Sequence, residues 1–509
     1  MSKTVLDRTP QRKLINMDRR EFLQSAGAVA AAAAVPGSRA FAEALKPDPL
    51  VGIQVGAVSF VDEGVEKCLD VFQQDGGVNT LFTATFTYGR GIAGRQVPGQ
   101  PLPDHGKQQY DTDTFRGGCY TRVDPKHFVN TAFKDFRAPD LGDYDVLEAV
   151  LPAAKQRGMK TICWFEDVFR KDLSNIDQLA EKELSGEKSV TVCFNNPNYR
   201  NWLLGMVENW ARLYEVDGIM WGSERQGAFA NMLDAHAGGP GSPMRVTCFC
   251  QFCEAKAKAG GVDPERARKG FLELAKFVEM SRQGARPADG YYVALWRLML
   301  NYPELLAWEM LWTESLRDTY AAIYAKVKEV KPSLQVGWHI WHNNSFNPIY
   351  RAEQDLQVIA PHSDFLKIVI YNNCGGERLS NYIRNVGGTL YGDIPGQELL
   401  EFHYRLLNYE EKSLKELPFT GLSADYVHRE TKRAREGLAG TRTLLWPGID
   451  IDIPTQEGNS RCSPEGVRDA TLAAFQGGAD GVILSRKYSE MTLANLRGAG
   501  IAVRQALKA

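Results

Sequence analysis

Eight short apolar, β-rich stretches alternate with helical stretches along this chain, and this alternation limits the fold more than any other feature. The stretches are residues 50–60, 79–89, 160–169, 217–222, 334–342, 365–371, 441–453 and 480–485. Near-continuous apolar runs are typical of parallel strands that are buried on both faces. Eight strand–helix repeats predict an α/β protein with a (β/α)8 barrel rather than an open doubly wound sheet. The first stretch is not followed by a G-x-G-x-x-G motif, which also argues against a dinucleotide-binding fold.

Three longer segments interrupt the alternation. They are insertions at about residues 90–140, 226–300 and 372–435, after strands 2, 4 and 6. In a barrel, segments that follow strands lie over the C-terminal face, where active sites are built. We therefore predict a single catalytic barrel domain over residues 43–509, with these insertions around its active site.

The N-terminal 42 residues are expected to lie outside this domain. The sequence DRREFLQ, residues 18–24, precedes an alanine-rich run that ends in the A-x-A motif of residues 40–42. This pattern predicts a twin-arginine signal peptide, the export machinery as a partner, and a periplasmic or secreted mature protein. The other apolar runs are too short to span a bilayer, so we expect no membrane anchor once the signal is removed.

The charge balance and the aromatic content indicate the kind of partner. The formal net charge is −2, which gives no reason to expect nucleic acid as a partner. The chain contains 10 Trp, 19 Tyr and 23 Phe residues, and aromatic rings commonly stack on the faces of sugars. A carbohydrate substrate is therefore favoured. Assembly into an oligomer is compatible with the sequence.

Polar side chains gather where the expected strands end. They are Glu166 after strand 3, Glu224 and Arg225 after strand 4, Trp338, His339 and His342 on strand 5, Tyr371 and Asn372 after strand 6, Asp450 and Asp452 on strand 7, and Arg486 and Tyr488 after strand 8. Glycoside cleavage needs two opposed carboxyl groups, one to protonate the leaving oxygen and one to attack or to activate water.

We predict Glu224 as the acid, because strand 4 lies across the barrel from strand 7. Asp450 or Asp452 would then be the second carboxylate, and Glu166 is the reserve candidate for the acid. The neighbouring Arg225 would keep Glu224 ionised unless it points elsewhere. The remaining residues of the set are predicted to bind the substrate.

A cluster of cysteines predicts a metal site. The spacing C-x-C-x-x-C places three thiols close together, at Cys248, Cys250 and Cys253. Three such thiolates can bind one tetrahedral zinc ion, and Cys119, on the loop after strand 2, is the expected fourth ligand. Cys163 and Cys193 lie in or beside apolar runs and are interpreted as small buried hydrophobic residues. The alternative is one disulfide with free thiols. We expect structural zinc and no organic cofactor.

Three motifs carry a resemblance to a known family: NNPNYR at 195–200, VDGIMWGSER at 216–225 and CFCQFC at 248–253. With the expected barrel, they make the chain similar to the family 42 β-galactosidases and to exported glycoside-hydrolase-like barrel proteins. The resemblance implies a catalytic Glu at the end of strand 4, which is Glu224 here, with Ser223 in place of the family's Asn. It implies a nucleophile at the end of strand 7, where this chain has Asp450 and Asp452.

Two other functions fit the same residues. In a metal-dependent sugar isomerase, epimerase or lyase, Glu166, Glu224, His339 and Asp450 would bind a divalent ion. In a non-catalytic carbohydrate-binding barrel, the same surface would hold a glycan without cleaving it.

Overall fold

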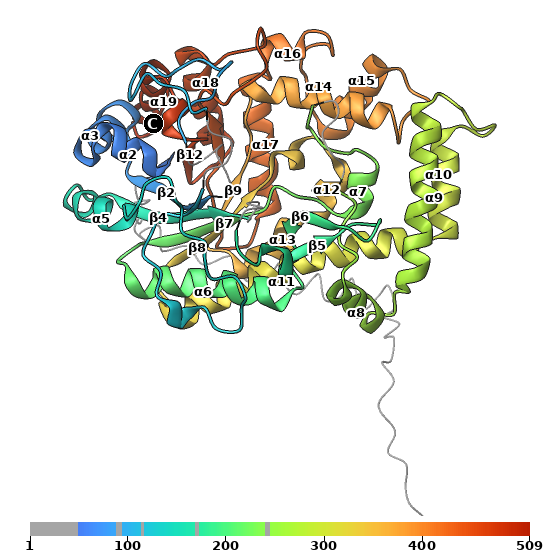
Figure 1. The fold of residues 1–509 in the computed structure, drawn as a ribbon. Helices are drawn as coiled ribbons and strands as arrows, with labels where there is room; N and C mark the ends of the chain where they lie inside the picture. The colour runs from blue at the N-terminus through green and yellow to red at the C-terminus, as the bar shows by residue number, and fades with distance from the viewer. Residues whose placement is uncertain (1–48, 88–93, 113–116, 168–172, 240–244, 509) are drawn as a thin grey trace, which may run out of the picture. The chain divides into compact units, whose positions relative to one another are not determined.

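The structure is a computed structural model that describes residues 49–87, 94–112, 117–167, 173–239 and 245–508 (Figure 1). Residues Asp48–Ala509 form one compact unit. The predicted signal peptide and the domain boundary after residue 42 lie outside the described residues. In the described ranges, no helix is long and apolar enough to cross a membrane.

The centre of the molecule is a parallel β-barrel. Its strands, in order around the barrel, are β1 (Leu50–Val55), β2 (Thr80–Thr87), β4 (Lys160–Glu166), β7 (Gly218–Gly222), β8 (Gln335–Ile340), β9 (Phe365–Ile368), the pair β10 (Leu444–Leu445) and β11 (Gly448–Asp450), and β12 (Gly481–Ser485). β10 pairs with β9, β11 pairs with β12, and β12 pairs with β1, all in parallel. A bridge from Val369 to Gly448 joins β9 to β11 as well. The barrel therefore closes, and the predicted (β/α)8 fold is confirmed.

The boundaries of two predicted strands differ from the structure. The seventh strand divides at Trp446 and Pro447, because proline has no N–H group to donate to the sheet. The Pro447 carbonyl still accepts a hydrogen bond from the Ile483 N–H at 2.9 Å, so the barrel stays closed there. The first strand ends at Val55, and the helix α2 (Ala57–Glu63) begins after Gly56.

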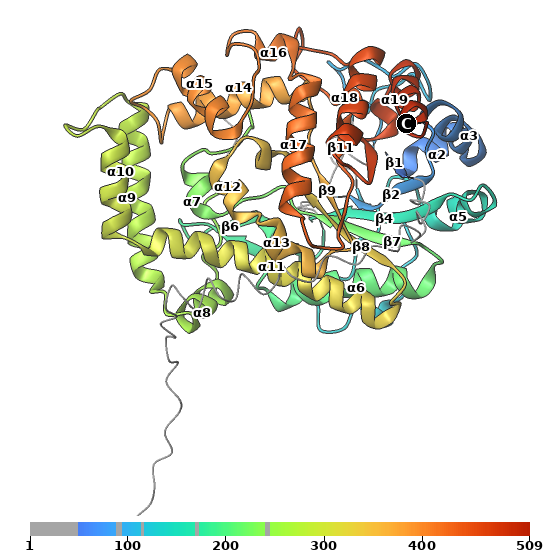
Figure 2. The same ribbon diagram turned by 180° about the vertical axis from the view of Figure 1, so that it is seen from behind.

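Helices cover the outside of the barrel, as Figures 1 and 2 show. They are α3 (Val65–Gly76), α5 (Val146–Gln156), α6 (Pro197–Leu213), α11 (Glu304–Val330), α12 (Pro348–Glu353), α13 (Leu356–Ile359), α17 (Ala424–Gly437), α18 (Pro464–Gln476) and α19 (Leu493–Ala506). Several begin with a side-chain cap. The Asn196 side chain accepts a hydrogen bond from the N–H of Asn198, and Pro197 occupies the first helical position of α6.

The segments between strand ends and these helices form the rest of the fold. After β2 come β3 (Gly118–Cys119) and a short helix at Pro125–His127; after β7 come α7 (Ala228–Met232), α8 (Gln251–Ala259), α9 (Pro264–Arg282) and α10 (Tyr291–Asn301); after β9 come α14 (Asn373–Gly387), α15 (Gly396–Leu407) and α16 (Leu417–Thr420). A hairpin of β5 (Ala180–Lys182) and β6 (Lys188–Val192) follows β4. The first three groups match the predicted insertions; the hairpin was not predicted.

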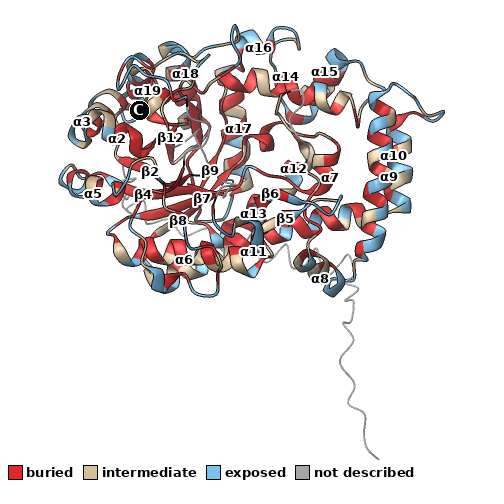
Figure 3. Ribbon diagram, viewed as in Figure 1, coloured by how far each residue is buried: buried red, intermediate tan, exposed pale blue. Residues whose placement is uncertain are grey.

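The barrel has two apolar layers. A small cluster fills its interior and includes Phe82, Trp164, Met220, Phe365 and Trp446. A larger cluster lies between the strands and the helices. Figure 3 shows both the strands and the inward faces of the helices as buried. The interior is therefore a packed core, and a substrate has access to the barrel only at its ends.

Two carboxyl groups meet outside the barrel, between α11 and α12. Glu309 accepts hydrogen bonds from the N–H groups of Phe229 (2.8 Å) and Ala230 (3.3 Å) at the start of α7. Burial raises the pKa of Glu309 to about 7, although these amides and a hydrogen bond with Glu353 oppose the rise. Burial and the charge of Glu309 raise the pKa of Glu353 well above its ordinary value. Two carboxyl groups can share a hydrogen bond only if one of them is protonated.

We expect this pair to make stability fall with rising pH. The folded state keeps a proton that the unfolded state releases near pH 4.5, so stability falls as pH rises from about 4.5 to about 7. Glu309→Gln removes this titrating group and should reduce the loss by on the order of 2 kcal/mol. Urea unfolding at about pH 5 and about pH 8 measures the effect. Glu329→Gln, at an exposed position of α11, is the control. Equal loss in Glu309→Gln and wild type would contradict the prediction.

Candidate active site

The interior of the barrel changes from apolar to polar at its C-terminal end. Along β4 the inward side chains are Ile162, Trp164 and then Glu166, since alternate residues of a strand face the same side. On β9, Lys367 follows the inward Phe365, and beyond β7 Glu224 lies two residues after Gly222. The apolar side chains in the barrel interior pack against the inner side of this polar layer. Active sites of such barrels lie at this C-terminal end.

Glu224 lies at the mouth of the barrel with one oxygen fixed and its carboxylate partly exposed. Its Oε1 lies 3.0 Å from Nε2 of His339, and 37% of its side chain is exposed. Only a glycine at position 222 leaves room for this histidine, since a Cβ there would lie 2.6 Å from Cβ of His339. Burial opposes the ionisation of Glu224, but the hydrogen bond with His339 and the charges of Arg378 and Arg486 lower its pKa to about 2. Glu224 is therefore an ionised carboxylate.

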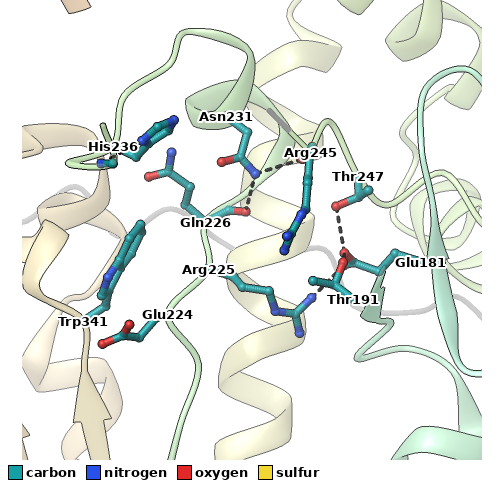
Figure 4. A pocket seen from close by; sticks show the side chains of 11 residues that line it. Glu181, Thr191, Glu224, Arg225, Gln226, Asn231, His236, Arg245, Thr247 and Trp341 are labelled. Carbon is teal, nitrogen blue, oxygen red and sulfur yellow. Dashed lines mark hydrogen bonds and ion pairs between the residues drawn. The ribbon is translucent and has the colours of Figure 1, made fainter. Parts of the chain in front are cut away.

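Glu224 also lines a pocket of about 240 Å³. In Figure 4 its carboxylate lies beneath the indole ring of Trp341, at one end of the pocket. Trp341 directly follows β8 and packs edge-on against Tyr350. An aromatic ring beside an ionised carboxylate is a suitable place for a sugar ring.

Lys367 is fully buried beneath this carboxylate, and sequence reasoning missed it. Its Nζ donates to Oε1 of Gln54 (2.6 Å) and to the Tyr371 hydroxyl (3.0 Å), and it lies 3.3 Å from Nδ1 of His339. Three acceptors match the three protons of an ammonium group. Burial lowers the pKa of Lys367 to about 7, and Glu166 and Glu224 oppose that effect. Because Lys367 donates to Nδ1, His339 carries its proton on Nε2 and donates it to Glu224.

A second histidine joins the site to α14. Nδ1 of His342 accepts a hydrogen bond from Arg378 at 3.0 Å, and its Nε2 lies 3.0 Å from the Tyr426 hydroxyl. Burial and the charge of Arg378 hold the pKa of His342 well below its ordinary value, so the ring is neutral. Arg378 in turn lies over the ring of Tyr371, 5.8 Å from its centroid. The predicted residues His342 and Tyr371 therefore border the same polar layer as Glu224.

Arg225 points away from Glu224. Its Nε donates to Asp167 at 2.7 Å and its Nη1 to Glu181 at 3.1 Å, and its guanidinium covers the ring of Phe194. Figure 4 shows the side chain directed toward Glu181. Arg225 is therefore a structural cation that joins the end of β7 to the β5–β6 hairpin. It also lines the pocket of Glu224, and its contact with a substrate stays a prediction.

The two aspartates of strand 7 hold the ends of other segments. Asp450 is fully buried and accepts hydrogen bonds from the N–H groups of Cys374 (2.8 Å) and Ile453 (3.1 Å). Asp452 has a left-handed backbone, with φ of 58°, and accepts hydrogen bonds from Thr492 and Asn495 at the start of α19. Both carboxylates thus have structural partners in this fold, and their catalytic role stays a prediction. Among the described residues, the group of side chains close enough to hold a metal ion consists of four cysteines and does not include Asp450.

Four other predicted residues lie outside the polar layer or at its edge. Trp338 faces outward, stacks on Tyr320 and donates to the His362 carbonyl at 3.0 Å. Tyr488 packs between Phe72 and His105. These contacts correct the predicted substrate contacts of Trp338 and Tyr488.

Asn372 and Arg486 lie nearer the site. Asn372 precedes α14, and its backbone carbonyl accepts a hydrogen bond from the Leu422 N–H. Arg486 pairs with Glu490, and its charge helps to keep Glu224 ionised. Arg486 therefore acts on the site through its charge.

Four cysteines form a cluster beside the barrel, but the fourth member is Cys193 rather than Cys119. Cys193, Cys248, Cys250 and Cys253 place their sulfur atoms within 4.8 Å of one another. Cys193 follows β6 and the other three lie at the start of α8. Cys119 lies on β3, with its sulfur 3.2 Å from the Thr121 hydroxyl. Burial raises the pKa of the Cys119 thiol to about 11, and its sulfur is not among the four that lie together.

The geometry of the cluster fits a metal ion. Cys193 Sγ lies 3.6 Å from Cys250 Sγ and 3.5 Å from Cys253 Sγ. Four sulfurs about 2.3 Å from one tetrahedral zinc would lie about 3.8 Å apart, whereas a disulfide needs about 2.05 Å. The N–H of Lys182 and the amide of Asn195 each donate to a sulfur at 3.3 Å. Such donors stabilise thiolates, so this buried cluster can bind a metal ion.

Comparison with known proteins identifies the N-terminal segment. Residues 16–36 match the model of the twin-arginine translocation pathway signal sequence. The predicted signal is thereby confirmed, and it indicates export by the twin-arginine route. No curated protein matches the chain.

Solved structures of glycoside hydrolases resemble the chain at low identity. The α-L-fucosidase isoenzyme 2 of Paenibacillus thiaminolyticus matches with 14% identity, a TM-score of 0.46, and coverage of 90% of this chain and 49% of that one. A β-galactosidase from Halorubrum lacusprofundi matches with 13% identity and a TM-score of 0.47, covering 90% and 58%. The PgaB (BpsB) glycoside hydrolase domain of Bordetella bronchiseptica matches with 11% identity and a TM-score of 0.43, covering 86% and 94%. The chain thus spans about half the length of the first two.

Proposed function

We propose that this chain is an exported glycoside hydrolase in which Glu224 is the ionised catalytic carboxylate. The observation that carries the proposal is the fixed geometry of Glu224. One oxygen accepts a hydrogen bond from His339, and the carboxylate opens into a pocket beside Trp341. A carboxylate with a pKa near 2 suits a nucleophile or a base better than the acid predicted from sequence.

Glu166 is the second carboxyl group of the proposed pair. It ends β4, directly opposite Gly222 of the neighbouring strand β7. Strands lie about 4.8 Å apart and rise about 3.3 Å per residue, so continuing the strand geometry of β7 by two residues would put the Cα of Glu224 about 8 Å from that of Glu166. Side chains from these positions can reach the separations that glycoside cleavage uses, about 5–9.5 Å between carboxyl groups. Glu166 would protonate the leaving oxygen while Glu224 attacks the sugar or activates water.

The buried residues beneath Glu224 act on it through His339. Lys367 donates to Nδ1 of His339 and so holds the proton on Nε2, facing Glu224. Gln54 and Tyr371 fix the position of the lysine in turn. In this arrangement Glu224 keeps its charge and its orientation while the substrate enters. Trp341 offers a face for a sugar ring, and Arg378 offers donors for sugar hydroxyls.

A panel of glycans and aryl glycosides, assayed for released reducing sugar or aryl alcohol, tests the proposal. Glu166→Gln should reduce turnover of natural glycans far more than turnover of aryl glycosides with good leaving groups, because these need little protonation. Equal losses on both substrate types would remove Glu166 from the acid role. If wild-type protein releases no product from any member of the panel, the hydrolase proposal fails.

We also propose that the cysteine cluster holds structural zinc. The ion would join the β5–β6 hairpin, through Cys193, to the start of α8. A four-thiolate site has no open position, so the ion would stabilise the fold and take no part in the reaction.

Zinc content of cysteine variants tests this proposal. Wild-type protein should contain one zinc per chain by elemental mass spectrometry. Cys253→Ser should lose most of it and melt at a lower temperature, because a hydroxyl is a poor zinc ligand. Cys119→Ser should keep its zinc, since Cys119 lies outside the cluster. Zinc loss in Cys119→Ser, or none in Cys253→Ser, would contradict the assignment.

A further inference from the structure

The helix α10 is apolar on its buried and its exposed face. Its sequence, YYVALWRLMLN, contains one charged residue, Arg297. Tyr291, Leu295 and Met299 are buried against the protein. The side chains exposed to solvent, by relative area, are Tyr292 (47%), Val293 (47%), Trp296 (46%) and Leu300 (77%). At 3.6 residues per turn these four lie within an arc of about 100°. They form one continuous stripe, called the α10 stripe below.

Two other outer helices, α9 and α18, differ from α10. The exposed positions of the adjacent α9 are mostly charged and include Glu265, Lys269, Lys276 and Glu279. The exposed positions of α18 are Glu465, Gly466, Asp469 and Gln476. A helix that is apolar all round is normally buried on all sides. The α10 stripe is therefore expected to be covered in the functional state of the protein.

We propose that the α10 stripe is the contact surface of a homodimer, in which α10 of a second copy packs antiparallel across it. The stripe exposes on the order of 400 Å² of apolar surface, comparable to the largest patch of a typical monomer, which is often functional. A standard interface buries about 800 Å² per partner, with an apolar centre and a polar rim. The stripe has the size of such a centre, and the charged face of α9 beside it supplies a rim.

A second copy suits this surface because the stripe is self-complementary. A two-fold axis near Trp296 brings Tyr292 and Val293 against the partner's Leu300, so the aromatic end of one stripe meets the aliphatic end of the other. Any charge near such an axis would face its own copy and repel it. The stripe has none, and Arg297 at its edge already pairs with Asp289 at 2.7 Å. The rim on α9 carries charges of both signs, so the rims of the two copies do not repel each other.

Sedimentation velocity on the full mature protein at micromolar concentration tests the proposal. Wild type should sediment with twice the mass of one chain, and Leu300→Glu and Trp296→Glu should sediment as monomers. Trp296→Glu places like charges at the two-fold axis, and Leu300→Glu places a charge against the apolar Tyr292 and Val293 of the second copy. Phe419→Glu, at an exposed position on α16, should remain dimeric. If Leu300→Glu loses its far-ultraviolet circular dichroism, Leu300→Ser replaces it. A monomeric wild type, or a folded Leu300 variant with unchanged mass, would overturn the proposal.

Discussion

Glu224→Gln is expected to lower turnover by about 10³-fold or more while leaving the fold intact. The amide keeps the size of the side chain but removes the negative charge that attacks the sugar or activates water. Glu224 is partly exposed and its hydrogen-bond partner is His339, so the substitution breaks no direct ion pair with a buried lysine or arginine. Turnover of the best substrate from the glycan panel measures the effect, with circular dichroism as a check on folding.

The control for this prediction is a glutamate that takes no part in the site. Glu148 lies on the exposed face of α5, and among the ion pairs of the described residues it pairs only with Arg122. Glu148→Gln should therefore keep wild-type turnover. Azide added to Glu224→Ala should restore part of the activity on aryl glycosides, since a small anion can occupy the space of the lost carboxylate. Inverted glycosyl azide would identify Glu224 as the nucleophile. Wild-type activity in Glu224→Gln would exclude Glu224 from catalysis.

Arg225→Met should destabilise the protein by about 3–5 kcal/mol, the typical cost of breaking a buried ion pair from one side. Asp167 and Glu181 are almost completely buried, with 1% and 3% of their side chains exposed. Methionine fills much of the space of the arginine but leaves both carboxylates without their cation. Urea unfolding, followed by the fluorescence of the ten tryptophans, measures the change.

An exposed ion pair supplies the matched control. Arg286 pairs with Asp393 at 2.7 Å, with 58% of its side chain exposed, and Arg286→Met should change stability by less than about 1 kcal/mol. Adding Asp167→Asn and Glu181→Gln to Arg225→Met should recover part of the lost stability, because the buried charges are then gone. Similar unfolding midpoints for Arg225→Met and Arg286→Met would refute the structural role of Arg225.

The fold could be predicted because the strands of a parallel barrel are buried on both faces and therefore appear as uninterrupted apolar runs. The limits of this signal are local. The run at 441–453 contains Pro447, which divides the strand, and the run at 50–60 continues into α2 without a change in hydrophobicity. The β5–β6 hairpin was missed because its strands are short and polar, so they carry no apolar periodicity.

The site was harder to predict because contacts between distant segments decide it. Lys367 interrupts an apolar run, and a lysine inside a buried strand was the signal that could have identified it. Trp338 could have been excluded from the predicted substrate-binding residues, because neighbouring residues of a strand face opposite sides and His339 faces inward. Asp452 leaves the strand through a left-handed turn, so the same rule fails there.

The cysteine cluster shows the same limit. Cys193 lies far from Cys248 in the sequence, at the end of the hairpin that was not predicted, and only the fold brings them together. Cys119 had the right residue type on a plausible loop, but its side chain turns to Thr121. Residue type and spacing therefore identified three members of the cluster, and the fourth depended on tertiary contacts.

Because the cysteine cluster is divided between two segments, folding, metal binding and export must occur in that order. Its four thiols meet only after the hairpin and α8 have docked, and the twin-arginine route transports proteins that have already folded. A metal ion held there would therefore be acquired in the reducing cytoplasm, where free thiols persist. By the time the protein reaches an oxidising compartment, three of the four sulfurs are already buried. The cytoplasmic metal supply, rather than that of the destination, would then decide which ion the exported protein carries.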